Sequence, residues 1–152
     1  MASEEKIAAL ERKIKALQMS YAGALADAVL RYGRAGILDE LTNAKRDEQM
    51  KGGPALAARL GIKEPKQAFQ NVQELYECAD WEYKDTETGF VAACANCMLQ
   101  ALCKKMGSGS PCRIFCLSPI EAIIRGLKPD AEFKVEKTLW EDEQCEVEVN
   151  CR

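Results

Sequence analysis

The chain has 152 residues, of which 47% are hydrophobic and 30% are charged, a balance typical of a folded globular protein. Lys and Arg total 21 against 24 Asp and Glu, so no surplus of positive charge is available to bind a nucleic-acid backbone. No apolar run approaches the roughly 18 residues that a membrane span needs, and the first residues lack the pattern of a signal peptide. We therefore expect a cytoplasmic protein whose partners include neither nucleic acid nor a membrane.

The chain contains eight cysteines and no histidine. Without histidine there is no Ser-His or Cys-His nucleophile pair, and no imidazole is available as a metal ligand. Clustered cysteines in a chain with no secretion signal are better explained as metal ligands or redox thiols than as a disulfide framework. We therefore expect the chemistry of this protein at its cysteines.

Residues 1–70 are predicted to form a helical region. The first helix should run from about Ser3, which would cap it, to Tyr32. An apolar stripe with alternating spacings of three and four residues marks one face of this helix: Ile7, Leu10, Ile14, Leu17, Tyr21, Ala24 and Ala28. The stripe is either the seam of a coiled-coil homodimer or a face that packs on the protein's own core, and its alanines favour an own-core or mixed role.

Three shorter helices are predicted after the first. Residues 37–51 should form one helix that stops at Gly52 and Gly53. Pro54 should open a second helix through residue 60, and a third is expected over residues 66–71.

Residues 71–152 are predicted to form an α+β, cysteine-rich region with a β-hairpin at each end. Strands are expected near residues 75–84 and 89–94, and a second hairpin should turn at residues 141–143. The fold class is therefore α+β, with N-terminal helices, a β-hairpin, two cysteine-bearing helices and a second β-hairpin that completes one antiparallel sheet. Alternation of apolar and charged residues predicts that one face of this sheet is covered.

Two motifs predict where helices between the hairpins begin. Ser110 precedes Pro111, a pair typical of a capped helix start. Ser118 and Glu121 are three residues apart, the spacing of a capping box.

Two close pairs of cysteines, Cys94-x2-Cys97 and Cys112-x3-Cys116, are the most informative motif of the chain. Positions three or four apart share a face of a helix, so each pair can present two thiolates to one ion. The N-terminal dipole of its helix should lower the pKa of the Cys112 thiol. Cys145, on the last strand, is a fifth candidate ligand. Redox thiols and plain core packing are the alternatives to metal binding.

The ligand chemistry limits the choice of metal. Ligands that are all thiolates suit zinc or an iron–sulfur cluster. We favour a [4Fe–4S] cluster over zinc because more than four cysteines are available and none has a histidine partner. Cys103 lies six residues beyond Cys97 and should point into the core, whereas Cys78 and Cys151 have no partner close in sequence.

The C-terminal half resembles the small 4-vinyl reductase and 2-aminothiazoline-4-carboxylate hydrolase-like families. The resemblance covers about residues 70–150 and depends on Ser-Pro-Ile-Glu-Ala at 118–122 and FKVEKTLWEDEQCEVEV at 133–149. The matching positions are Cys97, Cys112, Glu136 and Cys145, whereas Lys137 stands where the reductase branch has a cysteine. The resemblance implies a fold similar to Bet3-type transport-particle subunits, a cysteine-rich metal site and an apolar pocket for small molecules.

The main functional hypothesis is a small metal-binding protein that acts in redox sensing, electron transfer or the binding of a small apolar or heterocyclic ligand. The alternative is a metal-assisted hydrolase that opens a small sulfur–nitrogen heterocycle, with Glu121 or Glu136 as the base. More ordinary roles for these two residues are a helix cap and an exposed strand position. A third hypothesis is an interaction protein that forms a homodimer through the helix from Ile7 to Ala28.

Overall fold

The computed structural model describes residues 1–151 and shows an α+β fold, as the sequence predicts. Its elements in chain order are α1 (Ala2–Arg34), α2 (Leu38–Leu60), α3 (Pro65–Tyr76), β1 (Glu82–Asp85), β2 (Gly89–Cys94), α4 (Met98–Met106), the π-helix η1 (Cys112–Leu117), α5 (Ser118–Leu127), β3 (Glu132–Lys137) and β4 (Cys145–Asn150). The predicted cysteine-rich region ends at residue 152, which lies outside the described residues. No helix in the described part of the chain is both long and apolar enough to cross a membrane.

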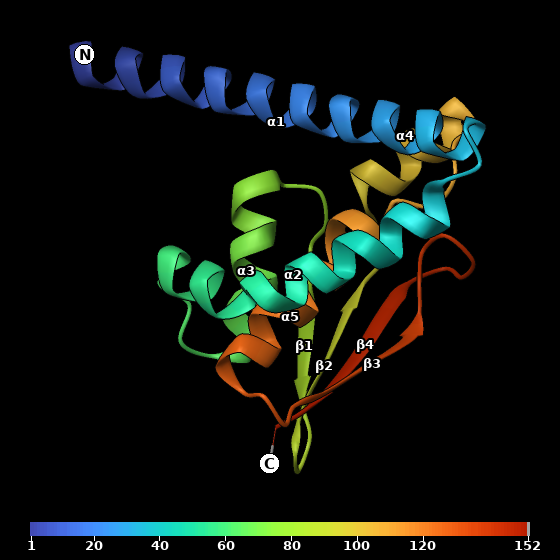
Figure 1. Ribbon diagram of the computed structural model, residues 1–152. Coiled ribbons are helices and arrows are strands. Elements are labelled where there is room, and N and C mark those ends of the chain that lie inside the picture. The colour runs from blue at the N-terminus through green and yellow to red at the C-terminus, as the bar shows by residue number, and fades with distance from the viewer. Residues whose placement is uncertain (152) are drawn as a thin grey trace.

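Both predicted hairpins are present and form one antiparallel sheet. The strand order is β1-β2-β4-β3, so β2 and β4 lie in the middle and pair with each other (Figure 1). Buried side chains alternate along β2 and β4, which shows that helices cover one face of the sheet. The first strand is shorter than predicted, because α3 extends to Tyr76 and β1 begins only at Glu82.

The main core lies between the covered face of the sheet and helices α3 and α5. Phe69 of α3 is fully buried and contacts Trp81 edge to face, with ring centroids 4.9 Å apart. The ring centroid of Phe90 on β2 lies 5.9 Å from that of Phe69. These aromatic contacts fix α3 against the sheet.

Helix α2 is a single helix, so the predicted break at Gly52 and Gly53 is wrong. A Cβ atom added at Gly53 would lie 2.1 Å from the carbonyl oxygen of Ala122 on α5. A Cβ atom at Gly126 would likewise lie 2.7 Å from the backbone nitrogen of Pro54. The glycines therefore permit the close approach of α2 and α5, and this packing stabilises a helix that Pro54 alone would weaken.

The predicted helix caps are also absent. Helix α1 begins at Ala2, so Ser3 lies inside it. Ser118 follows the π-helix directly and is buried, and the Glu121 side chain faces α2 instead of forming a capping box. Ser110 does not occupy the predicted cap position either, because the π-helix begins at Cys112 with Pro111 as its N-cap. Its Oγ nevertheless accepts a hydrogen bond of 3.2 Å from the backbone N–H of Cys112.

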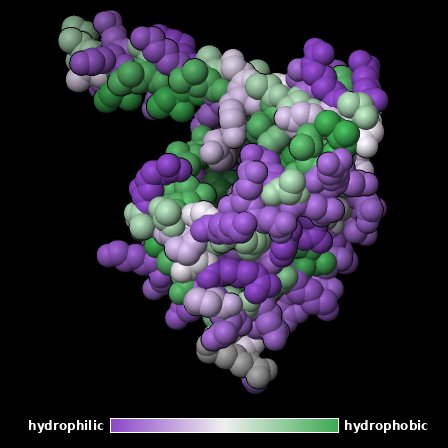
Figure 2. Space-filling view, in the orientation of Figure 1, coloured by the Kyte–Doolittle hydropathy of each residue, from purple (hydrophilic) through white to green (hydrophobic). Residues whose placement is uncertain are grey.

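The predicted apolar stripe of α1 is exposed along its N-terminal half, so the expectation that it packs on the protein's own core is wrong there. The residues that α1 buries in the body are Ala22, Ala26 and Val29. Successive helix residues are rotated by about 100°, so these three residues form a face next to the stripe. Residues 2–17 extend away from the body (Figure 1), whereas the Gln18 side chain donates a hydrogen bond of 2.9 Å to the carbonyl of Leu75 on α3. Figure 2 shows hydrophobic residues along the projecting segment.

Candidate functional site

All five cysteines predicted as metal ligands line one small cavity. Cys94 ends β2, Cys97 precedes α4, Cys112 and Cys116 lie on the π-helix, and Cys145 begins β4. The sheet register brings Cys94 and Cys145 directly opposite each other. The fold therefore gathers thiols that are up to 51 positions apart, from Cys94 to Cys145.

The cavity is small and apolar, and a second cavity lies on its far side. The first has a volume of about 20 Å³ and includes Trp81 and Leu99 in its walls. The second has a volume of about 30 Å³ and extends to Tyr21 of α1 and Tyr76 of α3. Cys97 and Cys116 line both cavities, so they stand between them. Each cavity is large enough for about one water molecule.

Cys97 is held against Cys78 by backbone contacts. The backbone N–H of Met98 donates a hydrogen bond of 2.7 Å to the carbonyl of Cys78, and Ala79 pairs with Cys97 in an isolated antiparallel bridge. The two side chains are therefore neighbours, although nineteen positions separate them in the sequence.

This contact shifts the pKa values of the two thiols in opposite directions. Hydrogen bonding from the Cys78 thiol, assisted by the backbone N–H groups of Gln100 and Leu99, lowers the pKa of Cys97 from 9.0 to about 6 although burial opposes it. The pKa of Cys78 is raised by the same hydrogen bond and by burial. At neutral pH, Cys97 is therefore a thiolate and Cys78 is a thiol.

A second pair of thiols lies across the two middle strands. Cys94 lowers the pKa of Cys145, and the backbone N–H of Leu139, 3.1 Å from the Cys145 sulfur, acts in the same direction. The pKa of Cys94 is raised by its hydrogen bond to Cys145 and by burial. The two cavities are therefore bordered by two pairs of thiols, and in each pair one thiol favours the charged form; Cys78 lines only the second cavity.

The thiols of the π-helix behave differently from the sequence expectation. Burial raises the pKa of Cys112 to about 11, although a lowered pKa was expected from the dipole of its helix. Burial also raises the pKa of Cys116, and the negative charge of Cys97 adds to this effect. Both side chains are therefore protonated at neutral pH, because the loss of hydration outweighs the influence of the helix terminus.

The thiols do not form a ready metal site. Among residues 1–151, no group of three or more Cys, Asp or Glu side chains has a geometry that could hold an ion. The iron–sulfur cluster or zinc ion remains a prediction that this arrangement of thiols does not support. Cys103 is fully buried in a small cluster with Ala26 and Leu99, which confirms its expected place in the core.

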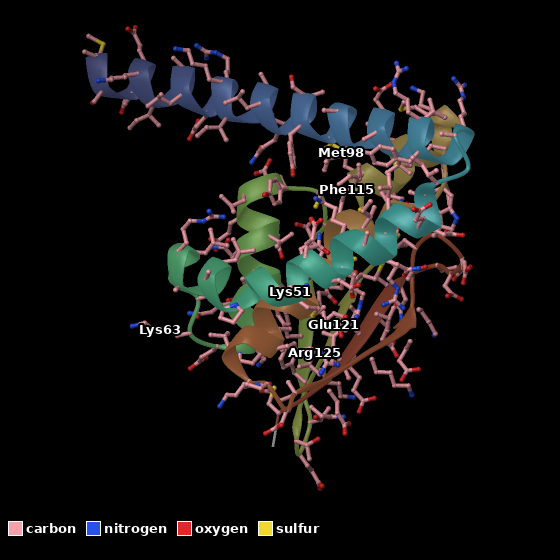
Figure 3. All side chains as sticks on the ribbon, in the orientation of Figure 1. Lys51, Lys63, Met98, Phe115, Glu121 and Arg125 are labelled. Carbon is pink, nitrogen blue, oxygen red and sulfur yellow. The ribbon has the colours of Figure 1, made fainter. Side chains whose placement is uncertain are left out.

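The two candidate bases lie elsewhere in the fold. Glu121 is 4% exposed and forms ion pairs with Arg46 at 3.0 Å and Arg125 at 2.9 Å. Figure 3 shows Glu121 and Arg125 beside α2, well separated from Met98, the residue next to Cys97. Glu136 is exposed on β3 and forms an ion pair with Lys134 at 2.6 Å. Neither residue lines the two thiol cavities.

Cys78 is the site residue that the sequence analysis missed. No cysteine lies within four positions of it, so its spacing gives no signal. The contact with Cys97 arises because the segment after α3 crosses the start of α4, and a local sequence pattern does not contain this information.

The chain matches the model of the family described as L-2-amino-thiazoline-4-carboxylic acid hydrolase over residues 11–148. No curated protein and no solved structure matches the chain at a significant level. The match confirms the resemblance identified from the C-terminal half and extends it to the N-terminal helices. Since it covers the thiol pairs and most of α1, the chain belongs to the L-2-amino-thiazoline-4-carboxylic acid hydrolase family.

Proposed function

We propose that this protein hydrolyses the ring of a small 2-amino-thiazoline carboxylate, with Cys97 as the nucleophile and Cys78 as its proton partner. The observation that carries the proposal is the position of Cys97, whose side chain borders both cavities and contacts Cys78. Membership of the hydrolase family supports the substrate class. A thiolate is a strong nucleophile and needs no histidine when neighbouring groups already stabilise its charge.

The reaction balances with one water molecule. The Cys97 thiolate adds to C2 of the ring, and the Cys78 thiol gives its proton to the ring nitrogen. The bond from C2 to the ring sulfur then breaks, and that sulfur leaves as a thiolate. Water adds to C2, its two protons pass to Cys78 and to the released sulfur, and Cys97 departs as a thiolate. The product carries a urea group and a free thiol, and nothing is oxidised or reduced.

The coupling of the two thiols suits this sequence of steps. While Cys97 is charged, it holds the proton on Cys78. Once the Cys97 sulfur is bonded to carbon it carries no negative charge, so the pKa of Cys78 falls and its proton becomes available. The same pair can therefore act first as nucleophile and stored proton, and later as leaving group and proton acceptor.

Substrate access requires the cavities to widen. Their volumes of about 20 and 30 Å³ are far below the size of a thiazoline ring with its carboxylate. Both cavities share Leu99 and Cys116, so an outward movement of these side chains would join them. In the joined space, C2 of the ring could reach the Cys97 sulfur.

The test is an assay of ring opening with L-2-amino-thiazoline-4-carboxylate as substrate, followed by mass spectrometry of the small molecules. We expect the wild-type protein to produce a compound heavier than the substrate by one water molecule. Cys97→Ser should lower the rate by a factor of at least about 100, because a neutral hydroxyl replaces a thiolate. Cys151→Ser is the matched control, since Cys151 lies at the C-terminal end of the fold, and its rate should equal that of the wild type.

Two results would contradict the proposal. One is the absence of product from the folded wild-type protein under reducing conditions. The other is a Cys97→Ser variant with the wild-type rate. The assay is repeated with a chelator, because a rate that disappears with the chelator and returns with added zinc would favour metal-assisted hydrolysis over attack by Cys97.

A further inference from the structure

The N-terminal half of α1 presents a row of large apolar side chains to solvent. Their exposed fractions are 55% for Ile7, 49% for Leu10, 54% for Ile14, 70% for Leu17 and 44% for Tyr21. No side chain from residue 2 to residue 20 is buried. A helical segment of this length is only marginally stable in water by itself. An exposed apolar face of this kind is typical of a surface that binds a partner.

The order of residues along the stripe matches a two-stranded parallel coiled coil. Isoleucines occupy positions 7 and 14 and leucines occupy positions 10 and 17, which are the a and d positions of two heptads. Isoleucine at a and leucine at d favour a parallel dimer. A helix that lies on a membrane would carry mostly basic residues on its polar face. The polar side chains around this stripe instead include both signs, with three Glu and four Lys or Arg between residues 4 and 15.

The charges beside the stripe are complementary to those of a second copy. Lys6 and Lys13 border the stripe on one side, and Glu11 and Gln18 border it on the other. In a parallel pair, the g position of one helix faces the following e position of the other, so Lys6 of each chain meets Glu11 of the second copy. In an antiparallel pair, the g positions of one helix face the g positions of the other, so the lysines of the two copies would lie together.

We propose that α1 pairs with α1 of a second copy of this chain in a short parallel coiled coil, with Ile7, Leu10, Ile14, Leu17 and Tyr21 in the seam and two ion pairs between Lys6 and Glu11. The inference does not depend on the proposed hydrolase activity. Tyr21 stacks on Tyr76 with ring centroids 5.0 Å apart and lines the cavity that reaches Cys97. The seam therefore ends at one side of the thiol cluster.

The first test measures the mass of the full chain by sedimentation equilibrium over a range of concentrations. We expect a dimer, and we expect Leu17→Glu to raise its dissociation constant by more than about 100-fold, because two charges would enter the apolar seam. Ala16→Glu is the matched control, since it adds the same charge one residue away on the outer face and should leave the dimer intact. Circular dichroism checks that both variants are folded, as expected for substitutions at exposed positions.

The second test determines the orientation by charge reversal. Lys6→Glu and Glu11→Lys should each weaken the dimer by about tenfold, since two attractive pairs become repulsive. The double variant should restore the wild-type dissociation constant, because its pairs are attractive again. The parallel arrangement would be excluded if neither single variant changed the dissociation constant. It would also be excluded if the double variant dimerised more weakly than both single variants.

Three outcomes would overturn the pairing itself. The first is a monomer at all concentrations up to several hundred micromolar. The second is a dimer that Leu17→Glu leaves unchanged. The third is a monomer that binds vesicles containing anionic phospholipid and loses this binding with Leu17→Glu, which would assign the stripe to a membrane surface instead.

Discussion

At the scale of single residues, proton affinity distinguishes the cysteines from one another. Cys97 and Cys112 line the same cavity, yet the pKa of one is lowered to about 6 and that of the other is raised to about 11. Cys97 has a thiol neighbour and backbone N–H groups that stabilise its charge, whereas Cys112 experiences mainly the loss of water. Local partners therefore decide which sulfur is reactive.

The rate of alkylation at each cysteine tests this difference. With iodoacetamide, the rate at Cys97 should rise with pH through a midpoint of about 6 and then level off, because only the thiolate reacts. Cys78→Ala should move this midpoint upward, towards the ordinary value of 9.0, since the main stabilising hydrogen bond is lost. Peptide mass spectrometry at a series of pH values gives both curves.

Cys112 is the internal control in the same samples. Its modification should stay low up to about pH 9 in the folded protein. A Cys97 midpoint near 9.0 in the wild type, or one that Cys78→Ala leaves in place, would contradict the pairing of Cys97 with Cys78.

Glu121 illustrates a residue that serves the fold in this structure. Its buried carboxylate accepts hydrogen bonds from Arg46 on α2 and Arg125 on α5, so it ties two helices together. Glu121→Gln should lower the free energy of unfolding by about 1.5–3 kcal/mol, because a buried, charge-assisted pair of hydrogen bonds is weakened. Urea denaturation measures this change.

Asp27→Asn provides the comparison for Glu121→Gln. Asp27 pairs with Arg31 at 2.8 Å on an exposed part of α1, where water screens the interaction. Its substitution should change the free energy of unfolding by less than about 0.5 kcal/mol. Equal effects of the two substitutions would show that burial of Glu121 adds nothing to its ion pairs.

At the scale of elements, the packing of α2 on α5 depends on glycine. Gly53→Ala should lower the free energy of unfolding by at least about 1–3 kcal/mol, because its Cβ atom would overlap the Ala122 carbonyl and force the helices apart. Gly52→Ala is the matched control, since nothing lies within 4 Å of its added Cβ atom. That variant should gain up to about 1 kcal/mol from helix propensity. If the Gly53→Ala and Gly52→Ala variants were equally stable, the close-packing explanation would be wrong.

The same elements show what a sequence can and cannot predict here. The two hairpins and the grouping of Cys94 with Cys97 and of Cys112 with Cys116 follow from alternation, spacing and turn residues, which are local signals. The position of Cys145 opposite Cys94 follows from the pairing of β2 with β4, which is not a local signal. The continuity of α2 does not follow from local signals, because a Gly-Gly-Pro run is equally consistent with a helix stop and with a site of close packing. The partnership of Cys78 with Cys97 and the protonation of Cys112 depend on contacts and burial that only the folded chain creates.

At the scale of the whole molecule, the structure combines a covered core with a projecting helix. Residues 22–29 of α1 contribute Ala22, Ala26 and Val29 to the body, while residues 2–20 contribute no buried side chain. The sequence stripe predicted an apolar face of this helix but not which part of it would be left uncovered. The family match begins at residue 11, so it includes residues 11–17 of the projecting segment together with the part of α1 that packs on the body.

The projecting half of α1 is also a lever arm. It is about 30 Å long, so a tilt of about 5° around residue 22 would move its free end by about 2.6 Å. Just beyond this pivot, Ala26 contacts Leu99 and Cys103 on α4, the helix that begins next to Cys97. The binding of another helix near Ile7, far from the cysteines, would thus tilt α1, and this tilt would rotate α4 next to the Cys97 thiolate.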